Sequence, residues 1–182
     1  MSGPRIAPGG FREIGVFAFV FSRVAGVVSR TNPPNLFTTL GRHPALFRGW
    51  LRFAGRLMPG GKLPRRESEL VILRVAVLND CEYEHAHHVR LGKRAGLTSE
   101  EIARVSDGPA APGWSSRERA LLAAVDELHA TRDLSDDTWA TLQGHLDEPR
   151  LIELILLAGH YEMLATAINT LRIETDKSRR LG

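Results

Sequence analysis

The chain has 182 residues, of which 43% are hydrophobic and 25% are charged, the composition of an ordinary soluble globular protein. This length fits one domain, or one domain with an added arm, and it is enough to bury a sizeable core. The single cysteine, Cys81, excludes an intrachain disulfide and favours a reducing compartment, so we expect a cytoplasmic protein.

The formal net charge of +3 is unevenly distributed along the chain. The first 66 residues carry eleven Lys or Arg and one acid, whereas the rest carry thirteen bases and twenty acids. Arg48, Arg52 and Arg56 are spaced by four and would share one helix face. A basic region can contact nucleic acid or an anionic membrane, but no nucleic-acid motif accompanies it. We therefore expect neither partner, and instead a solvated face or one that pairs with acids of another subunit.

The first predicted helix, Phe11 to Val28, is apolar on most sides and needs a partner surface. Its most apolar run, Gly15 to Phe21, is bracketed by arginines and is too short to span a membrane, so no membrane segment is expected. Ser29 to Pro34 then breaks the chain, because residues before proline avoid helical geometry.

Seven further helices follow from apolar residues that recur at three and four positions and from capping signals. The helix Pro64 to Leu78 is almost entirely apolar after Glu69, which predicts a central position. No alternation of period two persists, so we predict an all-α, single-domain bundle of eight or so helices. The other predicted helices are Pro44–Met58, Cys81–Ala95, a short one after Thr98 or Ser99, Ser115–Thr131, Ser135–Leu146 and Glu148 to about Ile173.

Capping residues sharpen several of these boundaries. Asp80 is the predicted N-cap of the helix that starts at Cys81, and Gly96 ends that helix. Ser115 with Glu118 three residues on forms the pattern of a capping box.

The segment with the most chemistry runs from Cys81 to His88. Cys81, Glu84, His85 and His88 are offset by three, four and seven residues, so a helix would place them on one face. Glu69 lies on the preceding helix, and a short connection makes the two helices antiparallel neighbours. A thiol, imidazoles and two carboxylates are therefore expected to converge.

These groups suit proton-transfer or thiol chemistry. A cysteine in the first turn of a helix has a lowered pKa, and an imidazole exchanges protons near neutral pH. Two adjacent acids push one pKa upward, which yields a group that holds a proton at neutral pH. Two alternatives remain open: Cys81 as a small core residue, and a metal site formed by Glu84, His85 and His88. We expect no metal and no cofactor.

Four secondary candidates for substrate contact are Tyr83, His85, His160 and Tyr161. His160 and Tyr161 lie in the last, apolar helix, where a hydrogen-bonded core pair is the alternative interpretation.

Four stretches of the central segment are distinctive: Glu69–Ala76, Asn79–Glu84, His88 and Arg94–Thr98. Together they resemble the carboxymuconolactone decarboxylase and alkylhydroperoxidase D-like family. The resemblance covers residues of about 64–106, and the later Gly159-His160-Tyr161 with Asn169 resembles the last helix of the longer members. It implies an all-helical fold and a homo-oligomer, whether trimer, hexamer or dimer.

The resemblance also implies two chemistries. In the peroxidase branch a glutamate, two cysteines and a histidine act together, and their positions fall on Glu69, Cys81, Glu84 and His88. The second cysteine is replaced by Glu84, so an internal dithiol cycle is excluded. Cys81 would instead form a sulfenic acid that an external thiol reduces. The decarboxylase branch needs no thiol and would use Glu69, Glu84 and His88 as acid and base.

We therefore predict an enzyme that performs acid–base chemistry, of decarboxylase or lactone type, on a small organic substrate. The first alternative is a single-cysteine, peroxiredoxin-type oxidoreductase, and the second is a non-catalytic helical oligomer that binds a ligand. The expected organisation is an N-terminal arm over 1–34, a helical domain over 35–176 and a polar tail over 177–182.

Overall fold

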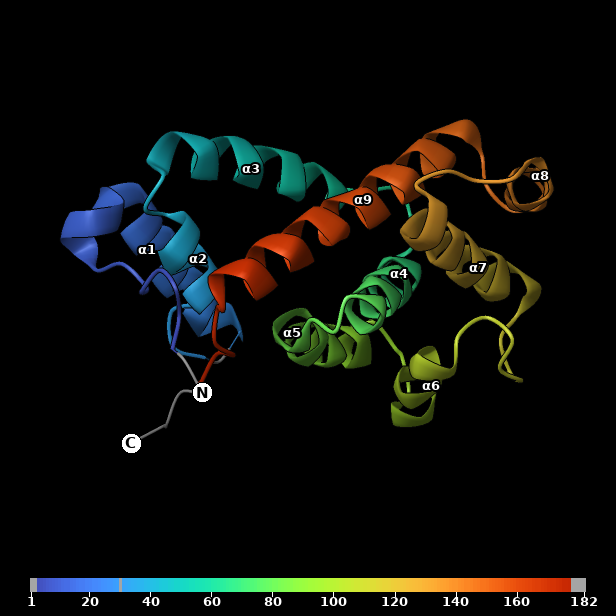
Figure 1. The fold of residues 1–182 in the computed structure, drawn as a ribbon, viewed down its shortest axis with the longest axis horizontal. Helices are drawn as coiled ribbons and strands as arrows, with labels where there is room; N and C mark the ends of the chain where they lie inside the picture. The colour runs from blue at the N-terminus through green and yellow to red at the C-terminus, as the bar shows by residue number, and fades with distance from the viewer. Residues whose placement is uncertain (1–2, 30, 178–182) are drawn as a thin grey trace. The chain divides into compact units, whose positions relative to one another are not determined.

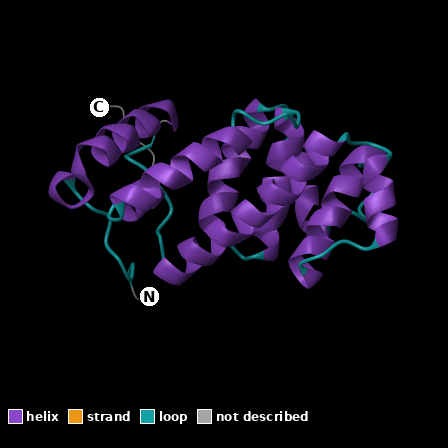
Figure 2. Ribbon diagram, turned by 90° about the horizontal axis from the view of Figure 1, so that it is seen from above, coloured by secondary structure: helices purple, strands orange, loops and turns teal. Residues whose placement is uncertain are grey.

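The structure is a computed structural model that describes residues 3–29 and 31–177. Helices dominate these residues and none of them forms a strand, as Figures 1 and 2 show, so the all-α prediction is confirmed. The helices of the described segments are α1 (Phe11–Ser29), α2 (Asn35–Leu40), α3 (Pro44–Leu57), α4 (Arg65–Leu78), α5 (Glu82–Arg94), α6 (Ser99–Arg104), the 3₁₀ turn η1 (Val105–Asp107), α7 (Ser116–Thr131), α8 (Asp136–Gln143) and α9 (Glu148–Leu171).

Three local predictions need correction. The short helix α2 was not expected, because its six residues are too few for a clear apolar period. Helix α8 ends at Gln143, before the predicted Leu146. Asp80 is not the N-cap of α5: it has a left-handed backbone with φ of 47°, and Cys81 occupies the cap position. Helix α1 is also kinked at Gly15, where φ is 71°.

The chain divides into two compact units, and the divisions fall inside α3 and α9. The first unit comprises the described residues of the segments Met1–Gly55 and Ala167–Gly182. Its core is Ile14, Ala18 and Phe47, surrounded by partly buried aromatic and aliphatic side chains. Edge-on ring pairs such as Phe21 with Phe37, whose centroids lie 5.2 Å apart, add to this packing.

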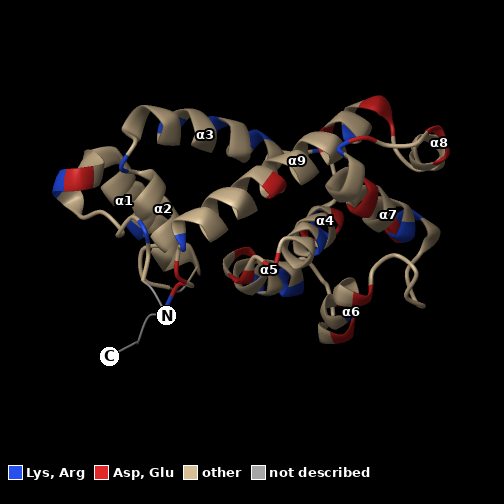
Figure 3. Ribbon diagram, viewed as in Figure 1, with Lys and Arg blue, Asp and Glu red and all other residues tan. Residues whose placement is uncertain are grey.

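The first unit leaves one side of α1 uncovered. Val16, Val20, Val24 and Val27 are all more than half exposed, and their spacing puts them along one face. The buried face of α1, with Ile14 and Ala18, has the partner surface that the sequence predicted, whereas the valine face is exposed. In Figure 3 Lys and Arg recur along α3 in the same unit, where no acid occurs.

The second unit, Arg56–Thr166, is built around α4. Nine consecutive residues of α4, from Ser68 to Ala76, are buried, as predicted for a central helix. Helices α5 and α7 pack against it. Its main apolar cluster is Leu70, Leu73, Leu97, Ile102, Val105, Ala111, Trp114 and Leu122.

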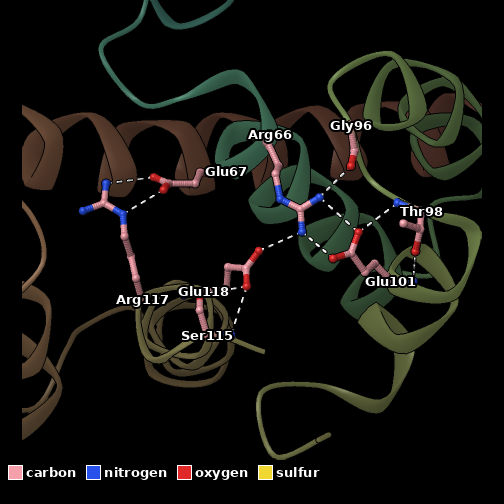
Figure 4. A network of polar contacts seen from close by, with 8 residues as sticks. All are labelled: Arg66, Glu67, Gly96, Thr98, Glu101, Ser115, Arg117 and Glu118. Atoms are coloured by element: carbon pink, nitrogen blue, oxygen red, sulfur yellow. Dashed lines mark hydrogen bonds and ion pairs between the residues drawn. The ribbon is translucent and has the colours of Figure 1, made fainter. Parts of the chain in front are cut away.

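A polar network ties the starts of α6 and α7 to α4 (Figure 4). Arg66 donates to Glu101 at 2.5 Å and to Glu118 at 2.9 Å. The same two carboxylates also accept the backbone N–H groups of Thr98 and Ser115, which completes two capping boxes. The hydrogen bond from Arg66 is the main reason that the pKa of Glu101 is lowered to about 2.

Two helix ends confirm their predicted signals. The Ser115–Glu118 capping box opens α7. At the end of α5, Gly96 has φ of 94°, and Leu97 N–H donates to Gly92 O at 2.9 Å, the pattern of a Schellman motif.

Helix α9 is long and apolar enough to cross a membrane, by length and composition only. Of its most apolar window, however, 56% is buried inside the protein, as in the core helix of a globular fold. Its Glu153 is buried and accepts the backbone N–H groups of Lys62 and Leu63, which fixes the loop before α4.

Candidate functional site

The connection between α4 and α5 is short and tightly hydrogen-bonded. Asn79 ends α4, Asp80 turns the chain through its positive φ, and Cys81 N–H donates to Ala76 O at 2.9 Å. The chain therefore reverses within three residues, and residues early in α4 face residues late in α5. At Gly92 a β-carbon would lie 3.0 Å from Cδ1 of Leu97, so glycine leaves room for the side chain that follows the turn at the end of α5.

The reversal joins Glu69, His88 and Glu84 into one buried cluster. His88 Nδ1 lies 2.7 Å from Glu69 Oε2, and His88 Nε2 lies 3.2 Å from Glu84 Oε2. All three side chains are at most 5% exposed. We call these three residues the relay cluster.

Both ring nitrogens of His88 therefore face a carboxylate. Burial alone would lower the pKa of His88, but the hydrogen bonds and charges of Glu69 and Glu84 outweigh it and raise the pKa to about 9. A protonated ring donates from both nitrogens, whereas a neutral ring would leave one nitrogen facing an acceptor. The arrangement thus holds one exchangeable proton at neutral pH.

The two carboxylates differ in their second oxygen. Glu69 Oε1 lies 2.7 Å from Nη2 of Arg65, an ion pair by distance that does not have hydrogen-bond geometry. Glu84 Oε1 is buried and has no hydrogen-bond partner among the described residues. A buried carboxylate oxygen without a partner is costly, and such groups concentrate where a substrate or a proton is handled.

Helix α9 contributes His160 and Tyr161 to the surroundings of the cluster. The ring of Tyr161 is perpendicular to that of His88, with centroids 5.1 Å apart, and His160 lies beside Tyr161. Burial, with the charges of Glu84 and Glu69, raises the pKa of Tyr161, so the phenol stays neutral. Burial lowers the pKa of His160, an effect that the charge of Glu84 opposes.

Cys81 lies beside the cluster and is 1% exposed. Burial raises the pKa of its thiol to about 11; the charge of Glu84 adds to this, while backbone N–H groups of Glu84 and Tyr83 favour the thiolate. The expected lowering of this pKa by the helix start is therefore wrong, because Cys81 is the cap rather than a first-turn residue and burial dominates.

The remaining predicted residues have separate places. Tyr83 is buried at the start of α5, and His85 is half-buried. Among residues 3–29 and 31–177, no group of three or more His, Cys, Asp or Glu side chains is arranged to hold a metal ion. The Glu84, His85 and His88 metal alternative thus finds no geometric support.

Two residues near the relay cluster, Arg65 and His87, were not among the predicted site residues. His87 Nδ1 accepts from Arg90 at 3.2 Å, and its ring lies 5.4 Å from that of His88. Burial lowers the pKa of His87 to about 3, with further lowering by the charges of His88 and Arg90. The signal for Arg65 was present in the sequence, since arginine four residues before a buried glutamate forms an ion pair on a helix.

A separate groove of about 390 Å³ lies between α4, α7 and α9. None of the predicted site residues lines it, so it is not the relay cluster's own cavity. Its lining residues are Val75, Val125, Leu128, His129, Arg132, Ile155, Ala158, Gly159, Glu162, Met163 and Thr166.

The fold is that of the alkylhydroperoxidase D-like helical proteins. A peroxidase-related protein from Ralstonia eutropha, described as an AhpD core, aligns with a TM-score of 0.85 at 16% identity over 96% of this chain and 93% of its own. A cysteine-to-alanine variant of the debrominase Bmp8, bound to 2,3,4-tribromopyrrole, aligns at 0.80 and 14% identity over 96% and 93%. A protein of unknown function from Agrobacterium tumefaciens, described as a candidate antioxidant defence protein AhpD, aligns with a TM-score of 0.68 at 23% identity over 72% of this chain and 91% of its own.

The model of the carboxymuconolactone decarboxylase family matches residues 44–127 of the chain. That match contains Glu69, Cys81, Glu84 and His88, the residues that the resemblance selects in the sequence. No curated protein shows significant sequence similarity to the chain.

Proposed function

We propose that the chain is an acid–base enzyme acting on a small organic acid or lactone, with decarboxylation as the leading reaction. The observation that carries this proposal is His88 held between two buried carboxylates, 2.7 Å from Glu69 and 3.2 Å from Glu84. Positioned groups that transfer a proton in the transition state typically accelerate a reaction by about 10²–10⁴-fold.

In this proposal Glu84 exchanges the proton with the substrate. When a carboxylate leaves as CO₂, the electron pair of the broken carbon–carbon bond remains on carbon and takes the proton that Glu84 donates. His88, an imidazolium that the Glu69 carboxylate stabilises, then passes its proton to Glu84, and the neutral imidazole regains one proton from solvent, so each CO₂ released consumes one proton. The free Oε1 of Glu84 supports this role, since the described part of the chain gives it no hydrogen bond.

The test is a panel of 3-oxo acids and lactones, assayed by release of CO₂ and by loss of lactone absorbance. Glu84→Gln should abolish turnover of any active substrate. Glu162→Gln is the matched control, because Glu162 pairs with His129 at 2.7 Å but is partly exposed and lies outside the cluster. Equal turnover by Glu84→Gln and wild type would rule out the proposed role.

A single-cysteine peroxidase is the second candidate, supported by the place of Cys81 at the cap of α5 beside Glu84. The Cys81 thiolate would attack a hydroperoxide, forming a sulfenic acid and releasing an alcohol. Two external thiols would then reduce the sulfenic acid to the thiol, with formation of their disulfide and water. The debrominase of similar fold, crystallised with a cysteine replaced by alanine and a small ring bound, makes a cysteine-dependent site on this fold worth testing.

Cys81→Ser separates the two candidates. Under the acid–base proposal the variant retains most of its decarboxylase or lactone turnover, whereas under the peroxidase proposal consumption of a hydroperoxide with an external thiol is lost. If the substrate panel and the peroxidase assay both give no turnover, the third interpretation, a ligand-binding helical protein, is favoured.

We also infer that the chain forms a homo-oligomer, as the family resemblance implies. The described face of α9 supports this, because Ile152, Leu156 and Met163 are each about half exposed and share one side of the helix. Light scattering after size-exclusion chromatography tests it, and the mass of a single 20.1 kDa chain would contradict it.

A further inference from the structure

One side of α9 is uncharged and exposed within the second unit. Ile152, Leu156, Gly159, Met163 and Thr166 are spaced alternately by four and three residues, so they form one line along the helix. The three large side chains among them are 46–59% exposed. We call these five residues the α9 seam. Spacing of this kind allows one helix to pack along another over several turns.

Gly159, at the centre of the α9 seam, is not required by the packing of the chain itself. Its φ is not positive, and a β-carbon built there would meet no atom within 4 Å. Glycine inside a helix is destabilising relative to alanine, because it loses more backbone freedom on folding. Such a glycine is typical of a place where another surface approaches the backbone closely.

A groove lies beside the α9 seam and has room for side chains of a facing helix. This groove of about 390 Å³ is lined by Gly159, Met163 and Thr166 of the seam, and also by the buried Val75 and Val125. Within the described residues, none of its buried side-chain nitrogen or oxygen atoms lacks a hydrogen-bond partner. The groove therefore suits apolar side chains, which fit into such spaces when two helices pack.

We propose that the α9 seam is a two-fold interface with a second copy of this chain, in which α9 crosses its partner at Gly159 and each copy places apolar side chains in the groove of the other. This inference rests on the homo-oligomer proposed above and specifies its surface. A two-fold interface uses the same patch on both copies, so the patch must complement itself. Exposed apolar side chains next to an apolar groove meet that requirement.

The exposed apolar area is sufficient for such an interface. Ile152, Ile155, Leu156 and Met163 are 37–59% exposed, which leaves on the order of 300–400 Å² of apolar side chain on each copy, the size of a patch that marks an interaction site. Two such patches, with the polar surface that surrounds the core of an interface, reach the ~1,000 Å² that a specific interface needs.

Helix α3 has a similar glycine but different surroundings. Leu46 and Phe53 are exposed on either side of Gly49, where an added β-carbon would also meet no atom within 4 Å. Arg52 and Arg56, three and seven residues after Gly49, share that side of α3 and are exposed. A two-fold contact there would bring like charges together, whereas the α9 seam has no charged residue.

The experiment measures the mass of the whole protein by light scattering and its dissociation constant by sedimentation over a range of concentrations. The wild type should have a mass that is an even multiple of 20.1 kDa. Gly159→Leu should raise the dissociation constant by about 30-fold or more, the effect of losing an interface hot spot, because a large side chain separates the two helices. Gly159→Ala should have a smaller effect. Both variants should keep the helical circular dichroism signal, since both residues favour helix more than glycine does.

Gly49→Leu is the matched control, because Gly49 is also an exposed helix glycine with no atom near an added β-carbon. It should leave the dissociation constant unchanged. The proposal is overturned if the oligomer has an odd number of chains, if Gly159→Leu associates as the wild type does, or if Gly49→Leu weakens association equally.

A monomeric wild type would reject both the α9 seam as an interface and the homo-oligomer, whereas an oligomer that tolerates Gly159→Leu would reject the seam alone. A monomer that co-sediments with phosphatidylcholine vesicles, and no longer does so when Met163→Asp is introduced, would overturn the proposal by assigning the seam to a lipid surface. None of these measurements needs a substrate, so their outcome is independent of the proposed acid–base activity.

Discussion

Two adjacent arginines in the first turn of α4, Arg65 and Arg66, contact two different polar clusters. Arg66 joins a half-exposed network in which Glu101 and Glu118 are fully engaged, each bonded to a guanidinium and to a backbone N–H (Figure 4). Arg65 reaches the buried relay cluster, where Glu84 keeps one oxygen without a hydrogen-bond partner in the described residues. Polar groups that make all their hydrogen bonds stabilise a fold, whereas a buried polar group without a hydrogen-bond partner indicates a candidate site for binding or proton transfer.

The largest loss of turnover is expected when the relay cluster itself is disrupted. Glu69→Gln removes the charge that stabilises the His88 imidazolium, so turnover of any substrate found in the panel should fall by about 10²–10⁴-fold. The change is isosteric, so the helical circular dichroism signal should not change. Steady-state kinetics measure the loss, and unchanged turnover would mean that the cluster is only structural.

Stability should depend on pH through His88. Its folded pKa is raised to about 9 from an ordinary value of 6.5, because Glu69 and Glu84 outweigh burial. A raised pKa contributes stability that is fully present below pH 6.5 and is lost as pH rises toward 9, by at most about 3 kcal/mol. Urea unfolding across this range measures it, and His88→Asn should flatten the curve.

Breaking the network rather than the relay should cost stability and spare activity. Arg66→Gln removes hydrogen bonds to two carboxylates, and partial solvent exposure limits the loss in the free energy of unfolding to about 1–2 kcal/mol. Turnover should remain within about twofold of the wild type. Chemical denaturation and kinetics on one preparation test both halves, and a large loss of activity with intact folding would contradict the separation.

The smallest effect comes from one cap. Thr98→Ala removes the hydroxyl that accepts the Glu101 N–H at 3.1 Å, and it should lower the free energy of unfolding by about 1 kcal/mol. Thr98→Ser should restore most of the loss. If Thr98→Ala weakens the protein as much as Arg66→Gln does, the cap rather than the arginine dominates the network.

Local sequence signals predicted much of this fold. The Ser115–Glu118 capping box, the turn at Gly96 and the buried character of α4 depend on neighbours within a few residues. The six residues of α2 are too few to show a clear apolar period, and a single glycine in an apolar helix does not reveal that its φ is positive.

The convergence of these side chains was predicted from the sequence, whereas their electrostatics were not. Spacing and family register selected Glu69, Glu84 and His88, which the structure joins. The thiol of Cys81 was expected to be acidified, but the burial that raises its pKa is a sum over distant segments that a helix position does not report. Arg65 escaped because an i,i+4 pair is common on helices, and only the burial of Glu69 makes this one consequential.

The central claim is that His88 carries a proton between two carboxylates, and NMR titration of its imidazole nitrogens tests it most directly. In the wild type His88 should remain doubly protonated at neutral pH and titrate near 9, and Glu84→Gln should move that titration to lower pH. A His88 that titrates near 6.5 in both proteins would contradict the relay.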